Sequence, residues 1–72
     1  MNIIELTKQH YPKGTRIELI SMDDPYAPIP SGTRGAVDHV DDMGQIHMKW
    51  DNGRTLALIP SEDRFIKIEE GK

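Results

Sequence analysis

The stretch of residues 31–59 constrains the fold more than any other part of this 72-residue chain. It holds three short runs with the alternation or side-chain content typical of strands, at residues 33–40, 45–50 and 54–59. Two turn signals, Asp-Asp-Met-Gly and Asp-Asn-Gly, separate these runs. Strands joined by such short turns pair with their chain neighbours, so the sequence predicts a small meandering antiparallel sheet.

The side chains around the second turn indicate its length. A two-residue Asn-Gly turn would point Leu56 and Leu58 away from the core face of the preceding strand. A three-residue Asp-Asn-Gly loop, with Gly53 in the left-handed conformation, turns both leucines inward. Burying a leucine is worth roughly 1.5–3 kcal/mol, so the three-residue loop is favoured. The cross-strand pairs that it predicts are Trp50 with Arg54, Met48 with Leu56, and Ile46 with Leu58.

Residues 2–11 are predicted to form a short N-terminal helix. Asn2 is a good cap, a glutamate three residues later completes a capping box, and a proline follows the helix. One face carries Ile3 and Leu6, with Ile4 beside it. So short a helix is marginal alone in water, so we expect these side chains to dock on one end of the sheet.

Two further strands are predicted outside the meander, at residues 16–22 and 65–68. The long connection after the first contains three prolines, which lack the amide donor that a regular ladder needs. The order of strands and loops is similar to that of an SH3-like barrel. The expected fold is therefore mainly all-β, a small five-stranded SH3-like barrel with a short N-terminal α-helix. We expect a single domain over residues 1–72, with the barrel at 15–68 and a polar tail at 69–72.

The composition limits the compartments in which this protein is expected and the kinds of partner that it is expected to bind. The net charge is −3 and the nine basic residues are scattered singly, which disfavours binding to a phosphate backbone. The chain has no cysteine, so it can form neither a disulfide nor a thiolate metal site. Its start lacks the pattern of a secretory signal, and no apolar stretch approaches the roughly 20 residues of a membrane helix. We expect a cytoplasmic protein without membrane association.

Several separated motifs, in one order along the chain, carry a family resemblance. They are Tyr11-Pro-Lys-Gly-Thr-Arg-Ile-Glu-Leu-Ile-Ser-Met-Asp-Asp-Pro-Tyr, Gly32-Thr-Arg-Gly, Trp50-Asp-Asn-Gly and Leu58-Ile-Pro. Together they resemble the bacterial family called domain of unknown function 4314, whose members are short proteins often linked to mobile genetic elements. The glycine–valine spacing of residues 32–40 is also similar to that of KOW-type barrels in ribosomal and transcription proteins. Since the domain of unknown function 4314 family has no assigned activity, the resemblance to it implies no catalytic residue or cofactor.

The residues themselves predict neither catalysis nor a metal site. Serines, histidines and aspartates are present, but no motif holds a nucleophile beside a base. His39 and His47 lie on neighbouring predicted strands, and the inferred register puts them on opposite faces, with His47 opposite Asp38. Both acidic turns are too short for a calcium loop. We expect no enzymatic activity, no cofactor and no metal ion.

The proline-containing loop is the first candidate for a binding surface, because long loops on rigid barrels often carry recognition. Its acidic and aromatic side chains suit a basic partner, and the acidic turn after the second strand adjoins it. The predicted function is therefore a non-catalytic protein-interaction module, a monomer or weak homo-oligomer. The residues predicted for this surface are Asp23, Asp24, Tyr26, Asp41, Asp42 and Trp50. Rigidity of the loop and core packing of the tryptophan are the alternative explanations of the same residues.

A second hypothesis is a KOW-like accessory protein that binds nucleic acid. Arg16, Arg34 and Lys49 are its predicted contacts, with aromatic side chains as stacking surfaces. These residues form no obvious basic and aromatic platform on the inferred register, because Lys49 faces away from Trp50. Protein binding is therefore the preferred of the two hypotheses.

Overall fold

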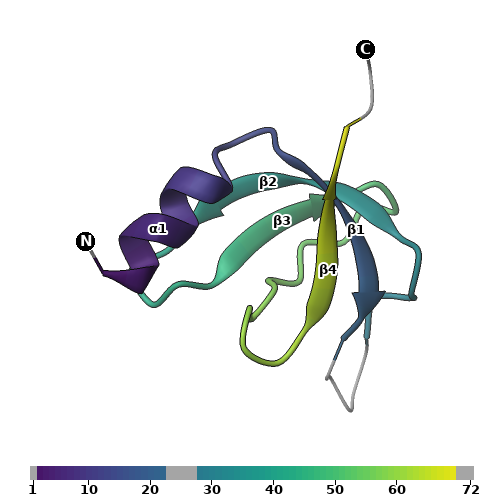
Figure 1. Ribbon diagram of the computed structural model, residues 1–72. Coiled ribbons are helices and arrows are strands. Elements are labelled where there is room, and N and C mark those ends of the chain that lie inside the picture. The colour runs from purple at the N-terminus through teal and green to yellow at the C-terminus, as the bar shows by residue number, and fades with distance from the viewer. Residues whose placement is uncertain (1, 23–27, 70–72) are drawn as a thin grey trace.

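The computed structural model describes residues 2–22 and 28–69, in which one helix precedes four strands (Figure 1). These elements are α1 (Ile3–His10), β1 (Arg16–Ser21), β2 (Arg34–Val40), β3 (Ile46–Trp50) and β4 (Arg64–Ile68). The strands pair antiparallel in the order β3-β2-β1-β4. The prediction of a mainly β chain with a short N-terminal helix is confirmed. Five strands and closure into a barrel are not, because the described residues form four strands in an open sheet.

The core lies on the inner face of the sheet. Alternate side chains are buried along β3 and along β1 as far as Leu19, because successive residues of a strand point to opposite faces. The buried hydrophobic side chains of the strands are Ile17, Leu19, Val37, Ile46, Met48 and Trp50. Leu58 and Ile29, which lie outside the strands, complete this core with 0% and 2% exposure. Ile29 belongs to the proline-containing stretch, where the sequence predicted only a stiff loop.

The hairpin after β3 has the predicted three-residue loop. The predicted register holds next to the loop and again at the far end of the hairpin. Gly53 has a φ of +89°, and the Trp50 N–H donates to the first carbonyl after the loop at 2.9 Å. Ile46 and Leu58 exchange two backbone hydrogen bonds, of 2.9 and 2.8 Å. Between these points the Leu56 carbonyl instead accepts a hydrogen bond from the Trp50 indole Nε1 at 2.8 Å. The predicted fourth strand is therefore reduced to a single bridge at Leu58.

A bulge in β2 changes which residues face one another across β2 and β3. Val37 pairs with Met48, but the next pair is His39 with His47, so Asp38 is an extra residue on β2. The predicted register, with Asp38 opposite His47 and the two histidines on opposite faces, is wrong. One inserted residue moves every later position of a strand to the other face, and here it brings His39 and His47 together.

The helix α1 begins as its capping pattern predicts, but its orientation differs from the prediction. Asn2 Oδ1 accepts a hydrogen bond from the backbone N–H three residues later at 2.8 Å. Ile4 and Thr7 are half-buried, whereas Ile3 is 77% exposed and Leu6 is 42% exposed. The helix lies at one end of the sheet, beside the end of β2 and the start of β3 (Figure 1). Two apolar side chains that were expected to dock therefore remain largely in solvent.

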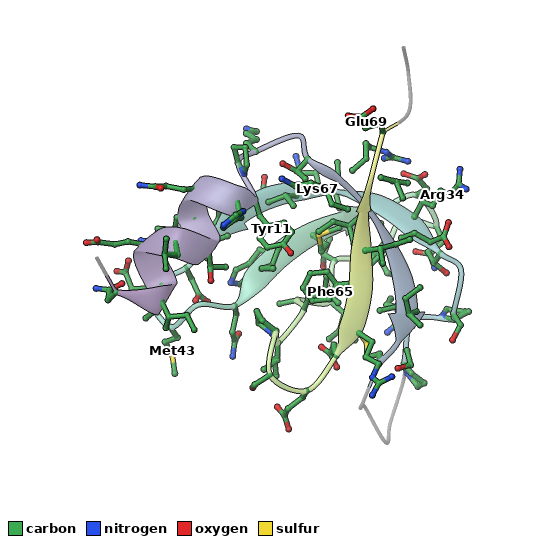
Figure 2. The ribbon with its side chains drawn as sticks, viewed as in Figure 1. Tyr11, Arg34, Met43, Phe65, Lys67 and Glu69 are labelled. Carbon is green, nitrogen blue, oxygen red and sulfur yellow. The ribbon has the colours of Figure 1, made fainter. Side chains whose placement is uncertain are left out.

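Aromatic contacts join the end of α1 to β4 (Figure 2). The Tyr11 ring meets Phe65 at an angle of 65°, with 5.7 Å between the ring centroids. Lys67 Nζ lies 5.5 Å from the Tyr11 ring centroid, within cation–π range. The turn before β4 is closed by Asp63, whose Oδ2 accepts from the Ile59 N–H at 2.8 Å. These contacts fix the helix and the Ile59 segment at the same end of the molecule.

Candidate functional site

The loop predicted as a binding surface is described only in part. Asp23, Asp24 and Tyr26 lie outside the described residues, so their role stays a prediction. In the described part of the loop, Ile29 is 2% exposed and packs in the core. This residue anchors the second half of the loop to the sheet.

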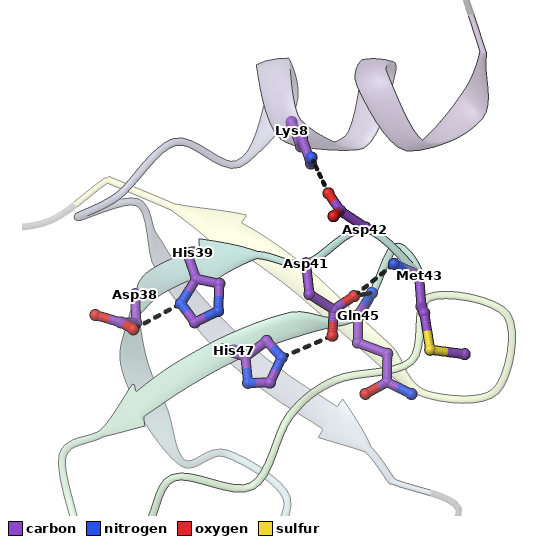
Figure 3. Close-up of polar contacts among 8 residues, drawn as sticks. All are labelled: Lys8, Asp38, His39, Asp41, Asp42, Met43, Gln45 and His47. Atoms are coloured by element: carbon purple, nitrogen blue, oxygen red, sulfur yellow. Dashed lines mark hydrogen bonds and ion pairs between the residues drawn. The ribbon is translucent and has the colours of Figure 1, made fainter.

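Asp41 organises the turn between β2 and β3 (Figure 3). Its Oδ1 accepts hydrogen bonds from the Met43 and Gln45 N–H groups, both at 2.9 Å, and its Oδ2 lies 2.8 Å from His47 Nε2. An ionised carboxylate only accepts, so His47 Nε2 carries the proton. The hydrogen bond from His47, and then those from the backbone, hold the pKa of Asp41 below its usual value. Both oxygens of this predicted binding residue are therefore engaged within the turn and β3.

Asp42, the next residue of the turn, reaches toward the helix instead. Lys8 Nζ lies 2.9 Å from Asp42 Oδ1 (Figure 3), and the Asp42 side chain is 99% exposed. An ion pair this exposed contributes about 0–1 kcal/mol, so it holds Asp42 only weakly. Among the described acidic candidates, Asp42 is accordingly the one that a basic partner can reach.

Trp50 packs inside the molecule rather than on a contact surface. Its side chain is 3% exposed, and its indole N–H donates to Leu56. Gly35 lies opposite Trp50 on β2, and a Cβ on this glycine would lie 2.9 Å from Trp50 Cα and 3.0 Å from its ring. The missing side chain of Gly35 thus makes room for the indole. Trp50 is therefore a core residue, in agreement with the alternative explanation and not with the predicted contact surface.

The three basic residues predicted for nucleic-acid binding each face a carboxylate. The contacts are Arg16 Nη1 and Nη2 to Asp51 Oδ1 and Oδ2 at 2.9 and 2.5 Å, Arg34 Nε to Glu18 Oε1 at 3.0 Å, and Lys49 Nζ to Asp38 Oδ1 at 3.7 Å. The hydrogen bonds from Arg16 hold the pKa of Asp51 below its usual value. Charges paired in this way give no concentrated positive potential, on which binding to a phosphate backbone depends.

The bulge of β2 creates a histidine pair that the sequence did not predict. The rings of His39 and His47 stack with centroids 4.4 Å apart and planes 7° from parallel. Asp38 Oδ2 lies 2.7 Å from His39 Nδ1, and Asp41 Oδ2 lies 2.8 Å from His47 Nε2 (Figure 3). The histidine side chains are 57% and 37% exposed. Each imidazole is thus held by its own carboxylate, at the surface.

An apolar groove separates α1 from the segment that follows Leu58. We call it the α1 groove; its volume is about 390 Å³, and its apolar lining comes from Ile3, Ile4, Met43, Gly44, Ile59 and Pro60. Ile3 and Met43 remain 77% and 80% exposed. Figure 2 shows Met43 at the N-terminal end of α1, with its side chain pointing away from the sheet. This groove was not predicted from the sequence; the one sequence signal that could have pointed to it is a methionine in an otherwise polar turn.

The described residues contain few features of other functional classes. Within residues 2–22 and 28–69, no three histidine, cysteine or acidic side chains gather into a group that could hold a metal ion. No helix in this part of the chain is both long and apolar enough to span a membrane. The described polar clusters are therefore the paired charges and the histidine pair given above.

Comparison with known proteins identifies the family. Neither the curated proteins nor the solved structures gave a match to this chain. A family model described as a domain of unknown function (DUF4314) matches residues 1–68, which cover the helix and all four strands. The chain therefore belongs to the DUF4314 family.

Proposed function

We propose that this chain is a non-catalytic module that binds a short segment of a partner protein in the α1 groove. The observation that carries the proposal is the exposure of Ile3 and Met43, 77% and 80%, on two segments that converge at one concave surface. A single exposed apolar residue is ordinary, but apolar residues gathered around a groove are typical of an interaction site. The groove volume of about 390 Å³ lies in the range of binding pockets, about 300–1,000 Å³.

Charge and size favour a short basic and apolar segment as the occupant. Asp42 adjoins Met43, and the exposed Glu62 follows the segment that lines the other wall. Lysine or arginine beside an apolar side chain complements this rim and the net charge of −3. A groove of this volume holds one or two side chains, whereas a stable protein dimer buries about 1,200–2,000 Å². A partner segment therefore suits it better than a second copy of the chain.

The proposal assigns no chemical step to the groove. Its polar lining consists of Thr7, Gln45 and Ser61, none of which titrates near neutral pH.

The sheet that carries the groove is interpreted as an SH3-like barrel. The pairing order supports this interpretation, because the bridge at Leu58 extends the sheet beyond β3 while β4 extends it beyond β1.

The direct test is the selection of binding peptides from a random library on the immobilised protein, followed by mapping of amide shifts with a selected peptide. The proposal predicts peptides that share an apolar residue flanked by lysine or arginine. The shifts should cluster at residues 3, 4, 7, 43–45 and 59–61, which line the groove. Replacing Met43 by serine should lower the affinity at least tenfold.

The matched control is Ile66→Ser, which changes an apolar residue of β4 that is 47% exposed and does not line the groove. It should leave peptide affinity unchanged. Failure to select any peptide, or shifts centred on another surface, would contradict the proposal. Oligonucleotide binding at low salt that is lost on replacing Arg16, Arg34 or Lys49 would favour the nucleic-acid hypothesis instead.

A further inference from the structure

We propose that His39 and His47 form a surface binding site for a divalent transition-metal ion. The two residues face each other across β2 and β3, and their ring centroids are 4.4 Å apart. Neither histidine and neither of their carboxylates lines the α1 groove. The pair is therefore a separate site, which shares with the groove only the turn that Asp41 holds. It arises from the β2 bulge, which is why the predicted register excluded it.

The hydrogen bonds leave one nitrogen of each ring open. Asp38 engages His39 Nδ1 and Asp41 engages His47 Nε2 (Figure 3). Because a carboxylate only accepts, each of these nitrogens carries a proton, and the lone pair of the neutral ring lies on His39 Nε2 and His47 Nδ1. A carboxylate that orients the far side of an imidazole is the usual second shell of a metal-bound histidine. Both rings of the pair have this support.

The spacing of the rings suits one shared ion. Two nitrogens bound to one zinc ion at about 2.0–2.1 Å each must lie within about 4.2 Å of each other. The ring centroids are 4.4 Å apart, so the two rings are near enough for their open nitrogens to reach that spacing once the rings turn. The rings are nearly parallel, so they must rotate out of the stack for their lone pairs to converge. Both side chains are exposed enough to rotate, at 57% and 37%.

Local charge also favours a cation. Asp38 and Asp41 bring two negative charges to the pair, and Lys49, 3.7 Å from Asp38, offsets one of them. Imidazole ligands favour zinc, nickel and copper over magnesium and calcium, which prefer oxygen. Two protein ligands leave the other coordination positions of the ion to water.

Calorimetry with Zn²⁺ alone, followed by nitrogen NMR of the imidazoles, tests the site. We expect one ion per chain, with the largest ring shifts at His39 Nε2 and His47 Nδ1. Replacing either histidine by asparagine should weaken binding at least tenfold, because one imidazole cannot chelate. His10→Asn is the matched control: it removes an exposed histidine on α1 and should leave the affinity unchanged.

A second variant separates the metal site from a merely structural stack. In Asp41→Asn, the amide oxygen can still accept from Met43 and Gln45, but its NH₂ group donates to His47 Nε2. The ring proton then moves to Nδ1 and blocks the open nitrogen, so zinc binding should fall about 10–100-fold while the fold is retained. The proposal is overturned if the wild type binds zinc no more tightly than His39→Asn, or if the shifts lie at His10.

Discussion

The inner face of the sheet and the α1 end of the molecule use apolar residues in opposite ways. On the inner face, Ile46 and Leu58 are completely buried, whereas at the α1 end Ile3 and Met43 are 77% and 80% exposed. Strand pairing places the first set, because it fixes every second residue inward. In the second set, Ile3 is placed by an eight-residue helix with no buried side chain, and Met43 is placed by the turn between β2 and β3.

The difference indicates that stability and recognition reside in separate regions. Residues placed by the sheet are needed to close the core, so they are not available to a partner. Ile3 and Met43 of the α1 groove contribute less to folding, because most of their surface stays in water. A substitution should therefore affect either stability or binding, according to its region, and the predictions below test this separation.

The largest effect is expected for Leu58→Ala. Removing this fully buried side chain should cost about 2–5 kcal/mol. A core in a chain of this size supplies only about 3–5 kcal/mol, so the variant should be partly or wholly unfolded at room temperature. Leu6→Ala on α1, where the leucine is 42% exposed, should change the free energy of unfolding by no more than about 1 kcal/mol. Equal losses in urea denaturation would remove the distinction between the two regions.

The next effect concerns Gly35→Ala on β2. The new Cβ would lie 2.8 Å from the Lys49 carbonyl oxygen and 2.9 Å from Trp50 Cα, so the strands must separate. We expect a loss of about 1–3 kcal/mol. Trp50 is the one tryptophan of the sequence, so its fluorescence emission should shift to longer wavelength as the ring gains water. Unchanged stability together with unchanged emission would show that the strands are not in close contact here.

Acid should destabilise the turn that joins the two regions. The pKa of Asp41 is held below its usual value of 3.8, chiefly by the His47 hydrogen bond. The charged carboxylate therefore contributes stability above 3.8, and this contribution is lost as the pH falls through the lower folded-state pKa. Asp41→Asn should flatten the decline of melting temperature below pH 4, more than Asp42→Asn, whose side chain is 99% exposed. An identical acid profile in both variants would contradict the role given to Asp41.

The smallest effect on stability is expected within the α1 groove. Met43→Ser and Ile3→Ser remove apolar side chains that are largely exposed, so each should alter the free energy of unfolding by no more than about 0.5 kcal/mol. Thermal denaturation of the two variants measures this change. A loss above about 1 kcal/mol would place these residues in the core and argue against their role in recognition.

The sequence predicts those parts of the fold that depend on local turns and alternation. The Ile46–Leu58 pairing is predicted from the burial of Leu56 and Leu58 and from a left-handed Gly53. In the structure Leu58 is fully buried, Leu56 is half-buried and Gly53 has a φ of +89°. The predicted strand at residues 54–59 did not form, because the Leu56 carbonyl bonds the indole of Trp50. This hydrogen bond from a side chain depends on the packed core, and local sequence patterns do not report it.

The candidate sites were less predictable than the core. One extra residue at Asp38 brings His39 and His47 together, and no glycine or proline marks this position in the sequence. The α1 groove likewise depends on how the helix is rotated against the sheet. That rotation leaves Ile3 rather than Ile4 in solvent, although the two residues are adjacent and chemically identical.

The most direct test of the account is a solution NMR measurement of the contacts between β2 and β3. The bulge predicts nuclear Overhauser effects between the His39 and His47 rings and between their backbones. The exchanged bonds of Ile46 and Leu58 should also protect both amides from hydrogen exchange. Contacts that place His47 opposite Asp38 alone, with the His39 ring on the other face, would contradict the register on which the histidine pair depends.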